Sequence, residues 1–144
     1  MRTGREAAVF VRRGEEFLLM HRVHDNYWHV AAGVVEDGEE FAAAAARELC
    51  EETGLDAIPT DLGLPQTYAI PPELRGDYLP GVEEVKVANF AVEAPAGWEP
   101  VLNEEHDDYR WFSLSDAIAL AHWPETIEII AALAHPRAPE SAAP

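Results

Sequence analysis

The segment Gly33–Leu55, GVVEDGEEFAAAAARELCEETGL, decides the fold of this chain. It combines five consecutive alanines with a leucine and several glutamates, residue types that favour helix. Gly54 follows the last of them and suits the left-handed conformation in which many helices end. The sequence therefore predicts a helix over Glu39–Thr53, entered from a turn at Glu36–Gly38 and closed at Gly54.

Three glutamates on this helix stand at positions i, i+3 and i+4: Glu48, Glu51 and Glu52. They fall within about 100° of arc on one face, where like charges repel by a few tenths of a kcal/mol per pair. No lysine is interleaved with them, whereas Mg²⁺ or Mn²⁺ would relieve the repulsion because hard cations prefer carboxylate oxygen. Taken alone, the cluster has an ordinary alternative, an acidic face exposed to solvent. A different face is predicted to pack on the core and holds Ala42, Ala46 and Leu49.

The segment resembles a known motif, the Nudix box GX5EX7REUXEEXGU, in which U is aliphatic. Every specified position matches: Gly33, Glu39, Arg47, Glu48, Leu49, Glu51, Glu52, Gly54 and Leu55. The chain is thus similar to the Nudix hydrolases over roughly residues 5–135. This resemblance implies an α/β fold, an α/β/α sandwich of the Nudix type with a mixed sheet and a catalytic loop-helix-loop.

The resemblance also implies a role for the matching residues. Three carboxylates would bind catalytic Mg²⁺, with Mn²⁺ as the alternative: Glu48, Glu51 and Glu52. Four residues would be structural, an ion pair that braces the loop-helix-loop and two glycines that permit tight backbone paths: Glu39, Arg47, Gly33 and Gly54. One departure precedes the box, where Ala32 stands in place of a second glycine that many members carry.

The rest of the chain alternates β-forming runs with two further helices, which independently favours a layered α/β domain. Strands are predicted at Glu6–Arg13, Glu16–His21, Tyr27–Ala31, Gln66–Ile70, Val85–Glu93 and Asp108–Phe112. Helices are predicted from a cap at Ser113 or Ser115 through Leu120, and from Pro124 to about His135. We expect one domain over residues 1–136 and a disordered tail, rich in alanine and proline, at 137–144.

Composition narrows the class of protein. The 144 residues carry a net charge of −17, with 48% hydrophobic content, so a globular domain is expected that binds neither nucleic acid nor anionic membranes. Cys50 is the only cysteine, which excludes an internal disulfide and a multi-cysteine zinc site. No apolar run approaches the ~20 residues of a membrane span, and the first ten residues, MRTGREAAVF, contain no signal-peptide h-region. A cytoplasmic enzyme, monomeric or homodimeric, is the expectation.

A second acidic segment, Asn103–Phe112, reads NEEHDDYRWF. It resembles the EHxxYxW stretch of one Nudix branch, the dihydroneopterin triphosphate pyrophosphatases. The resemblance implies that Glu105 is a metal ligand or base outside the box. His106 beside it is either a supporting residue or a surface histidine, and the whole run has the alternative of a solvated loop. Gly33–Leu55 and Asn103–Asp108 together hold eleven acidic residues and one arginine, so −10 of the net charge falls where metal binding is expected.

Three residues before the box are candidates for substrate binding: Arg22, Tyr27 and Trp28. An arginine at this place in several Nudix members reaches substrate phosphate or base, and its planar fork suits phosphate. The aromatic rings would stack on a base. The alternatives are a surface arginine on an edge strand and rings that pack in the core.

These observations predict Mg²⁺-dependent hydrolysis of a phosphoanhydride bond in a nucleoside triphosphate-like substrate, with release of a monophosphate and pyrophosphate. Candidates are a ribo- or deoxyribonucleoside triphosphate and dihydroneopterin triphosphate. The general base would be Glu48 or Glu51 within the box, or Glu105 outside it. Two alternatives remain, a hydrolase of dinucleoside polyphosphates or ADP-ribose, and an inactive nucleotide-sensing module.

Overall fold

The computed structural model describes residues 1–134, and the tail predicted at 137–144 lies outside the described residues. One mixed sheet holds the eight strands found in this range. They are β1 (Arg5–Arg13), β2 (Glu16–Arg22), β3 (Trp28–His29), β4 (Ala31–Val34), β5 (Thr60–Asp61), β6 (Gln66–Ala69), β7 (Glu84–Glu93) and β8 (His106–Phe112). The helices are α1 (Phe41–Thr53), the 3-10 helix η1 (Pro72–Asp77), α2 (Leu114–Leu120) and α3 (Pro124–Ala134). The prediction of a single domain over residues 1–136 stays a prediction.

Strand β1 lies at the centre of the sheet and is buried on both faces. It runs parallel to β7 and antiparallel to β2 and β4. Its side chains alternate between two hydrophobic cores, as the period of a strand requires: Val9 belongs to the core under α1, whereas Phe10 belongs to the core under α2 and α3. This double burial explains why the strand is a continuous apolar run rather than an alternating one.

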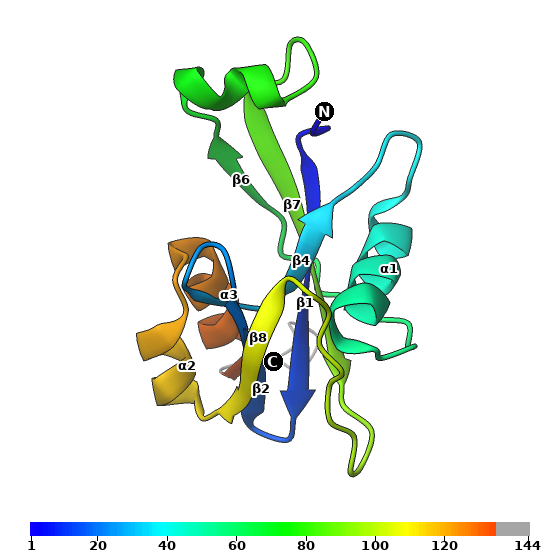
Figure 1. Cartoon of the computed structure of the whole chain (residues 1–144), viewed down its shortest axis with the longest axis vertical. Helices are drawn as coiled ribbons and strands as arrows, with labels where there is room; N and C mark the ends of the chain where they lie inside the picture. The colour runs from blue at the N-terminus through cyan, green and yellow to red at the C-terminus, as the bar shows by residue number, and fades with distance from the viewer. Residues whose placement is uncertain (135–144) are drawn as a thin grey trace, which may run out of the picture.

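The helices cover the two faces of the sheet, with α1 on one side of β1 and β4 and with α2 and α3 on the other (Figure 1). The predicted α/β/α sandwich with a mixed sheet is therefore confirmed. Strands β6 and the first half of β7 extend beyond this layered body together with η1 (Figure 1). None of the helices within residues 1–134 is long and apolar enough to cross a membrane.

The predicted helix 39–53 begins two residues later, at Phe41, because Glu39 and Glu40 stay in the preceding loop. It ends as predicted, with Gly54 at φ 78° donating its N–H to the carbonyl of Cys50. The predicted core face is wrong in part, since Ala42 is exposed and Ala46 only half-buried. The buried face instead consists of Ala44, Ala45, Leu49, Glu52 and Thr53.

The strand predicted over Tyr27–Ala31 is two strands with different partners. β3 pairs with β2, with His29 opposite Met20, whereas β4 pairs with β1, with Val34 opposite Glu6. The chain therefore crosses from one strand of the sheet to another at Val30, which is buried. Two short elements were not predicted, β5 and η1. Ser113, rather than Ser115, caps α2 by accepting the N–H of Asp116 at 3.3 Å.

Candidate active site

The carboxyl-terminal half of α1 packs closely against β4. The carboxylate of Glu48 lies directly over Gly33, where a Cβ would come within 2.2 Å of it. One turn on, Glu52 turns into the protein, is 1% exposed, and its Oε2 accepts the backbone N–H of Ala32 at 3.1 Å. Glycine at position 33 therefore makes room for one carboxylate, and the strand backbone orients the other.

Arg47 fastens the preceding loop to the helix. Its guanidinium donates to both carboxylate oxygens of Glu39, at 2.9 and 3.0 Å, to the carbonyl of Val34 at 3.0 Å and to Glu48 at 2.9 Å. The arginine and a backbone N–H donated by Glu36 lower the pKa of Glu39 to about 2. These contacts hold the loop 34–39 and the Glu48 carboxylate in one fixed arrangement.

The start of β8 brings the second acidic segment to Glu52. Arg22 on β2 pairs with His106 at a bulge in the register, and the carbonyl of Glu105 accepts the N–H of Val23 at 3.0 Å. Ligand atoms of Glu52, Glu105 and His106 all lie within 4.8 Å of one another. Two segments more than fifty residues apart therefore meet at one cluster.

His106 is not a surface residue, so that alternative is wrong. Its side chain is fully buried, and its Nε2 lies 3.8 Å from Oε1 of Glu52. Within the described part of the chain, neither ring nitrogen has a hydrogen-bond partner. Burial, and then the charge of Arg22, lower the pKa of His106 to about 4. The ring is therefore neutral at pH 7, with a nitrogen lone pair available.

The electrostatics of the cluster suit a hard divalent cation. Burial raises the pKa of Glu52 far above its ordinary value, and the carboxylates of Glu48 and Glu105 raise it further. Burial also raises the pKa of Glu48, although Arg47 opposes the shift. Carboxylate oxygens with one neutral imidazole form a donor set that Mg²⁺ or Mn²⁺ accepts. The residues present therefore fit the metal that the sequence predicts.

Glu51 occupies a different environment from its two neighbours in the box. Its side chain is 55% exposed, and Oε2 lies 3.5 Å from Nη1 of Arg47. It is outside the group of ligand atoms that includes Glu52. The three glutamates that share one helix face therefore divide into two that turn toward β4 and one at the solvent edge.

The structure gives the three substrate-binding candidates protein partners. Arg22 forms an ion pair with Asp25 at 2.7 Å, and it neighbours the cluster of Glu52, Glu105 and His106 because His106 is its partner in the strand register. Tyr27 stacks on His122 at 4.4 Å between ring centroids, and Trp28 packs edge-on against Phe112 at 5.4 Å. Both rings are therefore engaged in packing near α2 and α3.

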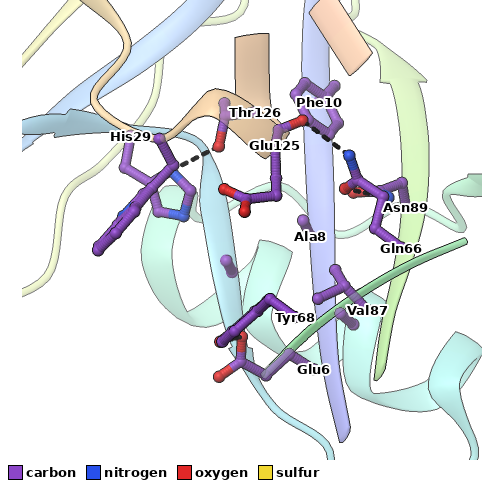
Figure 2. Close-up of a pocket in the computed structure, with 13 residues that line it drawn as sticks. Glu6, Ala8, Phe10, His29, Gln66, Tyr68, Val87, Asn89, Glu125 and Thr126 are labelled. Atoms are coloured by element: carbon purple, nitrogen blue, oxygen red, sulfur yellow. Dashed lines mark hydrogen bonds between the residues drawn. The ribbon is translucent and has the colours of Figure 1, made fainter. Parts of the chain in front are cut away.

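A cavity of about 160 Å³ on the α3 face was not predicted (Figure 2). Its wall comes from β1, β3, β4, β6, β7 and the first turn of α3. The signals available in the sequence were weak: Asn89 interrupts an apolar strand, and it proves to be 2% exposed. Glu125 carried no signal, because a glutamate in the first turn of a helix is commonplace.

The fold and the metal-type cluster on a loop-helix-loop define a class, and comparison with known proteins agrees. A family model described as NUDIX domain matches residues 2–133. The chain belongs to the Nudix family, and the predicted enzyme class, a Nudix hydrolase, is confirmed.

Two relatives and one solved structure are similar to this chain over most of its length. The dihydroneopterin triphosphate diphosphatase of Escherichia coli (strain K12) is 30% identical over 118 residues, which cover 78% of each chain. A protein named octanoyltransferase from Myxococcus xanthus is 37% identical over 115 residues, or 77% of this chain, which spans only 30% of that relative's length. The solved structure of the E. coli dihydroneopterin triphosphate pyrophosphohydrolase superposes with a TM-score of 0.77 at 26% identity, covering 90% of this chain and 93% of that one.

Proposed function

We propose that the chain is a Mg²⁺-dependent hydrolase of a phosphoanhydride bond in a nucleoside triphosphate-like substrate, releasing a monophosphate and pyrophosphate. The observation that carries the proposal is the carboxylate of Glu52, buried beside Glu48 and Glu105 where no described lysine or arginine pairs with it. A buried carboxylate without positive charge is costly, and a divalent cation removes that cost. The named activity of the E. coli relative supports a triphosphate substrate, dihydroneopterin triphosphate included.

Glu48, Glu52 and Glu105 would hold the ion, with the neutral ring of His106 beside them and Glu51 at the exposed edge. When bound, such an ion supplies positive charge to phosphate oxygens and makes water a stronger nucleophile at neutral pH. The bound ion would then give this acidic chain a positive site for its anionic substrate. For the same reason we propose a small nucleotide, rather than nucleic acid, as the substrate.

The general base is a separate assignment within the proposal. Arg47 donates a hydrogen bond to Glu48 at 2.9 Å, whereas the exposed Glu51 has only a longer ion pair at 3.5 Å. The Glu105 side chain is exposed. Glu51 and Glu105 are therefore freer than Glu48 to accept a proton from water, and Glu105 also faces the buried carboxylate of Glu52.

A screen of nucleoside and pterin triphosphates with Mg²⁺, read by pyrophosphate release, tests the proposed reaction. Dinucleoside polyphosphates and ADP-ribose belong in the same screen, because their turnover would replace the proposed substrate class. Absence of turnover on every phosphoanhydride would leave the inactive nucleotide-sensing module as the surviving hypothesis.

Glu105→Gln tests the residue outside the box, with the adjacent exposed Glu104→Gln as the matched control. We expect Glu105→Gln to lower kcat by about 10²-fold or more and to remove the acidic limb of the pH–rate profile if this carboxylate is the base. Glu104→Gln should keep the wild-type rate. Equal rates for the two variants would favour the alternative in which the acidic segment is a solvated loop without a catalytic role.

A further inference from the structure

The cavity on the α3 face lies across β4 from the carboxylate cluster. Successive residues of β4 point to opposite faces, so Gly33 meets Glu48 while the adjacent Ala32 lines the cavity. The N–H of Ala32 also donates to Glu52. One residue of β4 therefore connects the proposed metal site to the cavity.

The cavity is unsuited to phosphate. None of the thirteen described residues that line it is a lysine or an arginine, whereas Glu6 and Glu125 both are carboxylates. Burial lowers the pKa of His29, on the same wall, to about 3, so its ring is uncharged at neutral pH. An anionic group would gain no positive partner here, and a neutral group of the substrate is the better occupant.

The size and the apolar surfaces of the cavity suit a flat ring. Its volume of about 160 Å³ is similar to the ~150 Å³ of an engineered protein cavity that holds benzene. Ala8, Phe10 and Val87 supply apolar wall, and the Trp123 side chain also lines the cavity. Such a mostly apolar pocket with a few placed polar groups is typical of sites for aromatic heterocycles.

The two side-chain amides of the wall, Asn89 and Gln66, have already used their N–H donors. The amide of Asn89 donates to the carbonyl of Leu64 at 2.8 Å and to Oε1 of Gln66 at 3.0 Å. The amide of Gln66 donates in turn to the carbonyl of Glu125 at 3.0 Å and to Glu128 at 3.2 Å. These bonds fix the two amides, so that Asn89 and Gln66 offer a ligand oxygen acceptors rather than N–H donors.

The Glu125 carboxylate is the principal free acceptor. Figure 2 shows it directed into the cavity between His29 and the β1 residue Ala8. Among residues 1–134, none donates a hydrogen bond to its two oxygens, whereas Glu6 already accepts from Arg2 at 2.7 Å and from Tyr68 at 2.9 Å. Glu125 therefore has both oxygens available to a ligand.

We propose that this cavity binds the ring of the substrate, and that the ring carries a 2-amino-4-oxopyrimidine edge, as guanine and pterin rings do, with Glu125 accepting from its ring N–H and its amino group. The inference rests on the proposed function for the place of the phosphates. Two adjacent, coplanar N–H donors match the two oxygens of one carboxylate, and hydrogen bonds to a charged acceptor are the stronger kind. Adenine presents a bare ring nitrogen at the corresponding edge, and hypoxanthine lacks the amino group.

Binding of the monophosphates GMP, IMP and AMP, measured by calorimetry at millimolar ligand with Mg²⁺ and again with EDTA, tests the proposal without any hydrolysis. The phosphate is the same in all three, so differences in affinity report the ring. We expect GMP to bind about 10- to 100-fold more tightly than IMP or AMP. Neopterin against guanosine then distinguishes a pteridine from a purine as the preferred ring.

Glu125→Gln should remove the preference for GMP over IMP, because a glutamine must present one N–H donor where the ligand also presents a donor. Glu128→Gln is the matched control: it lies one turn along α3, outside the cavity wall, and keeps an oxygen acceptor for Gln66. It should retain the wild-type preference. Equal binding of the three monophosphates, no binding of GMP or neopterin, or a preference that survives Glu125→Gln would overturn the proposal.

These outcomes are separable from those of the proposed reaction. Hydrolysis without ring preference would leave the reaction standing and remove the ring assignment. A ring preference that depends on Glu125, in a protein without turnover, would support the ring assignment and contradict the proposed reaction.

Discussion

The two faces of the central sheet place acidic side chains in opposite situations. On the α1 face, Glu52 is buried against other carboxylates, and its pKa is raised by burial and by Glu48. On the α3 face, Glu6 accepts hydrogen bonds from Arg2 and Tyr68. On the first face, no lysine or arginine within residues 1–134 pairs with Glu52. On the second face, Glu6 is paired with donors of the chain, whereas the Glu125 carboxylate is left for a ligand. Under the two proposals, the α1 face binds the cation that neutralises the phosphates and the α3 face binds the ring of the substrate.

The largest expected effect comes from removing the unmet negative charge on the α1 face. Glu52→Gln should lower kcat/KM by more than about 10²-fold, beyond the usual loss for a residue that only supports a metal ligand. Without metal the variant should unfold at the same or a higher temperature, because a buried carboxylate has been replaced by a neutral group. Calorimetric scans with and without Mg²⁺ check this, since the metal should raise Tm only in the wild type.

Glu40→Gln, an exposed change at the start of α1, is the control for that experiment and should behave as wild type. Retained turnover in Glu52→Gln would contradict the proposed difference between the two faces, because the reaction would then need no cation at this carboxylate.

The next-largest expected effect distinguishes two adjacent residues of β4 that point to opposite faces of the sheet. In Gly33→Ala the new methyl group would meet the Glu48 carboxylate, which must move away from β4. We expect kcat to fall about 10- to 100-fold, but the free energy of unfolding to fall by only about 1 kcal/mol, because the displaced atoms are the flexible end of a side chain. Steady-state kinetics and urea unfolding measure the two quantities.

Ala32→Gly is the matched change on the opposite side of β4. It removes a methyl group from the cavity wall and should leave kcat near the wild-type value. If both variants lost kcat equally, the two faces would not be functionally distinct.

Arg47→Lys tests the brace rather than the carboxylates themselves. A lysine cannot reproduce the paired bonds to Glu39 together with those to Val34 and Glu48. We expect the free energy of unfolding to fall by about 2–3 kcal/mol, with a smaller loss of kcat than in Gly33→Ala. Chemical denaturation measures the first effect. A stability equal to that of the wild type would show that the loop 34–39 is held without this arginine.

The two faces also differ in how far the sequence predicts them. The α1 face is encoded mainly in one continuous segment. Helix propensity was enough to predict the helix, whereas the prediction that its glutamates bind metal depended on the resemblance of the segment to the Nudix box. The boundary and the buried face were displaced, because Glu39 binds Arg47 in the loop and Glu52 turns inward to Ala32. These are tertiary contacts, and local propensity does not contain them.

The α3 face is assembled from six elements distributed along the chain, none of which carries a motif. His29, Gln66 and Glu125 become neighbours only after β3, β6 and α3 are in place. The aromatic residues near the box were the natural candidates for ring binding, but Tyr27 and Trp28 pack against His122 and Phe112. Composition identifies residues able to bind a ring, whereas topology decides which of them line a cavity.

The smallest expected effect is a pH dependence of stability that belongs to the α3 face. The pKa of His29 is lowered to about 3 by burial, and next by the charge of Arg22, against an ordinary value near 6.5. Between these values the unfolded chain binds one more proton than the folded one, so the free energy of unfolding falls as the pH drops below about 6.5. From pH 7 to pH 5 this residue should account for a loss of about 1–2 kcal/mol in the free energy of unfolding.

His106, whose pKa is lowered to about 4, acts in the same direction, so His29→Gln should flatten the pH dependence without abolishing it. The exposed His24→Gln should keep the wild-type slope, as measured by urea unfolding at several pH values. An unchanged slope in His29→Gln would mean that the fold does not lower the pKa of His29, and the ring would then gain its positive charge near pH 6.5, as in the unfolded chain.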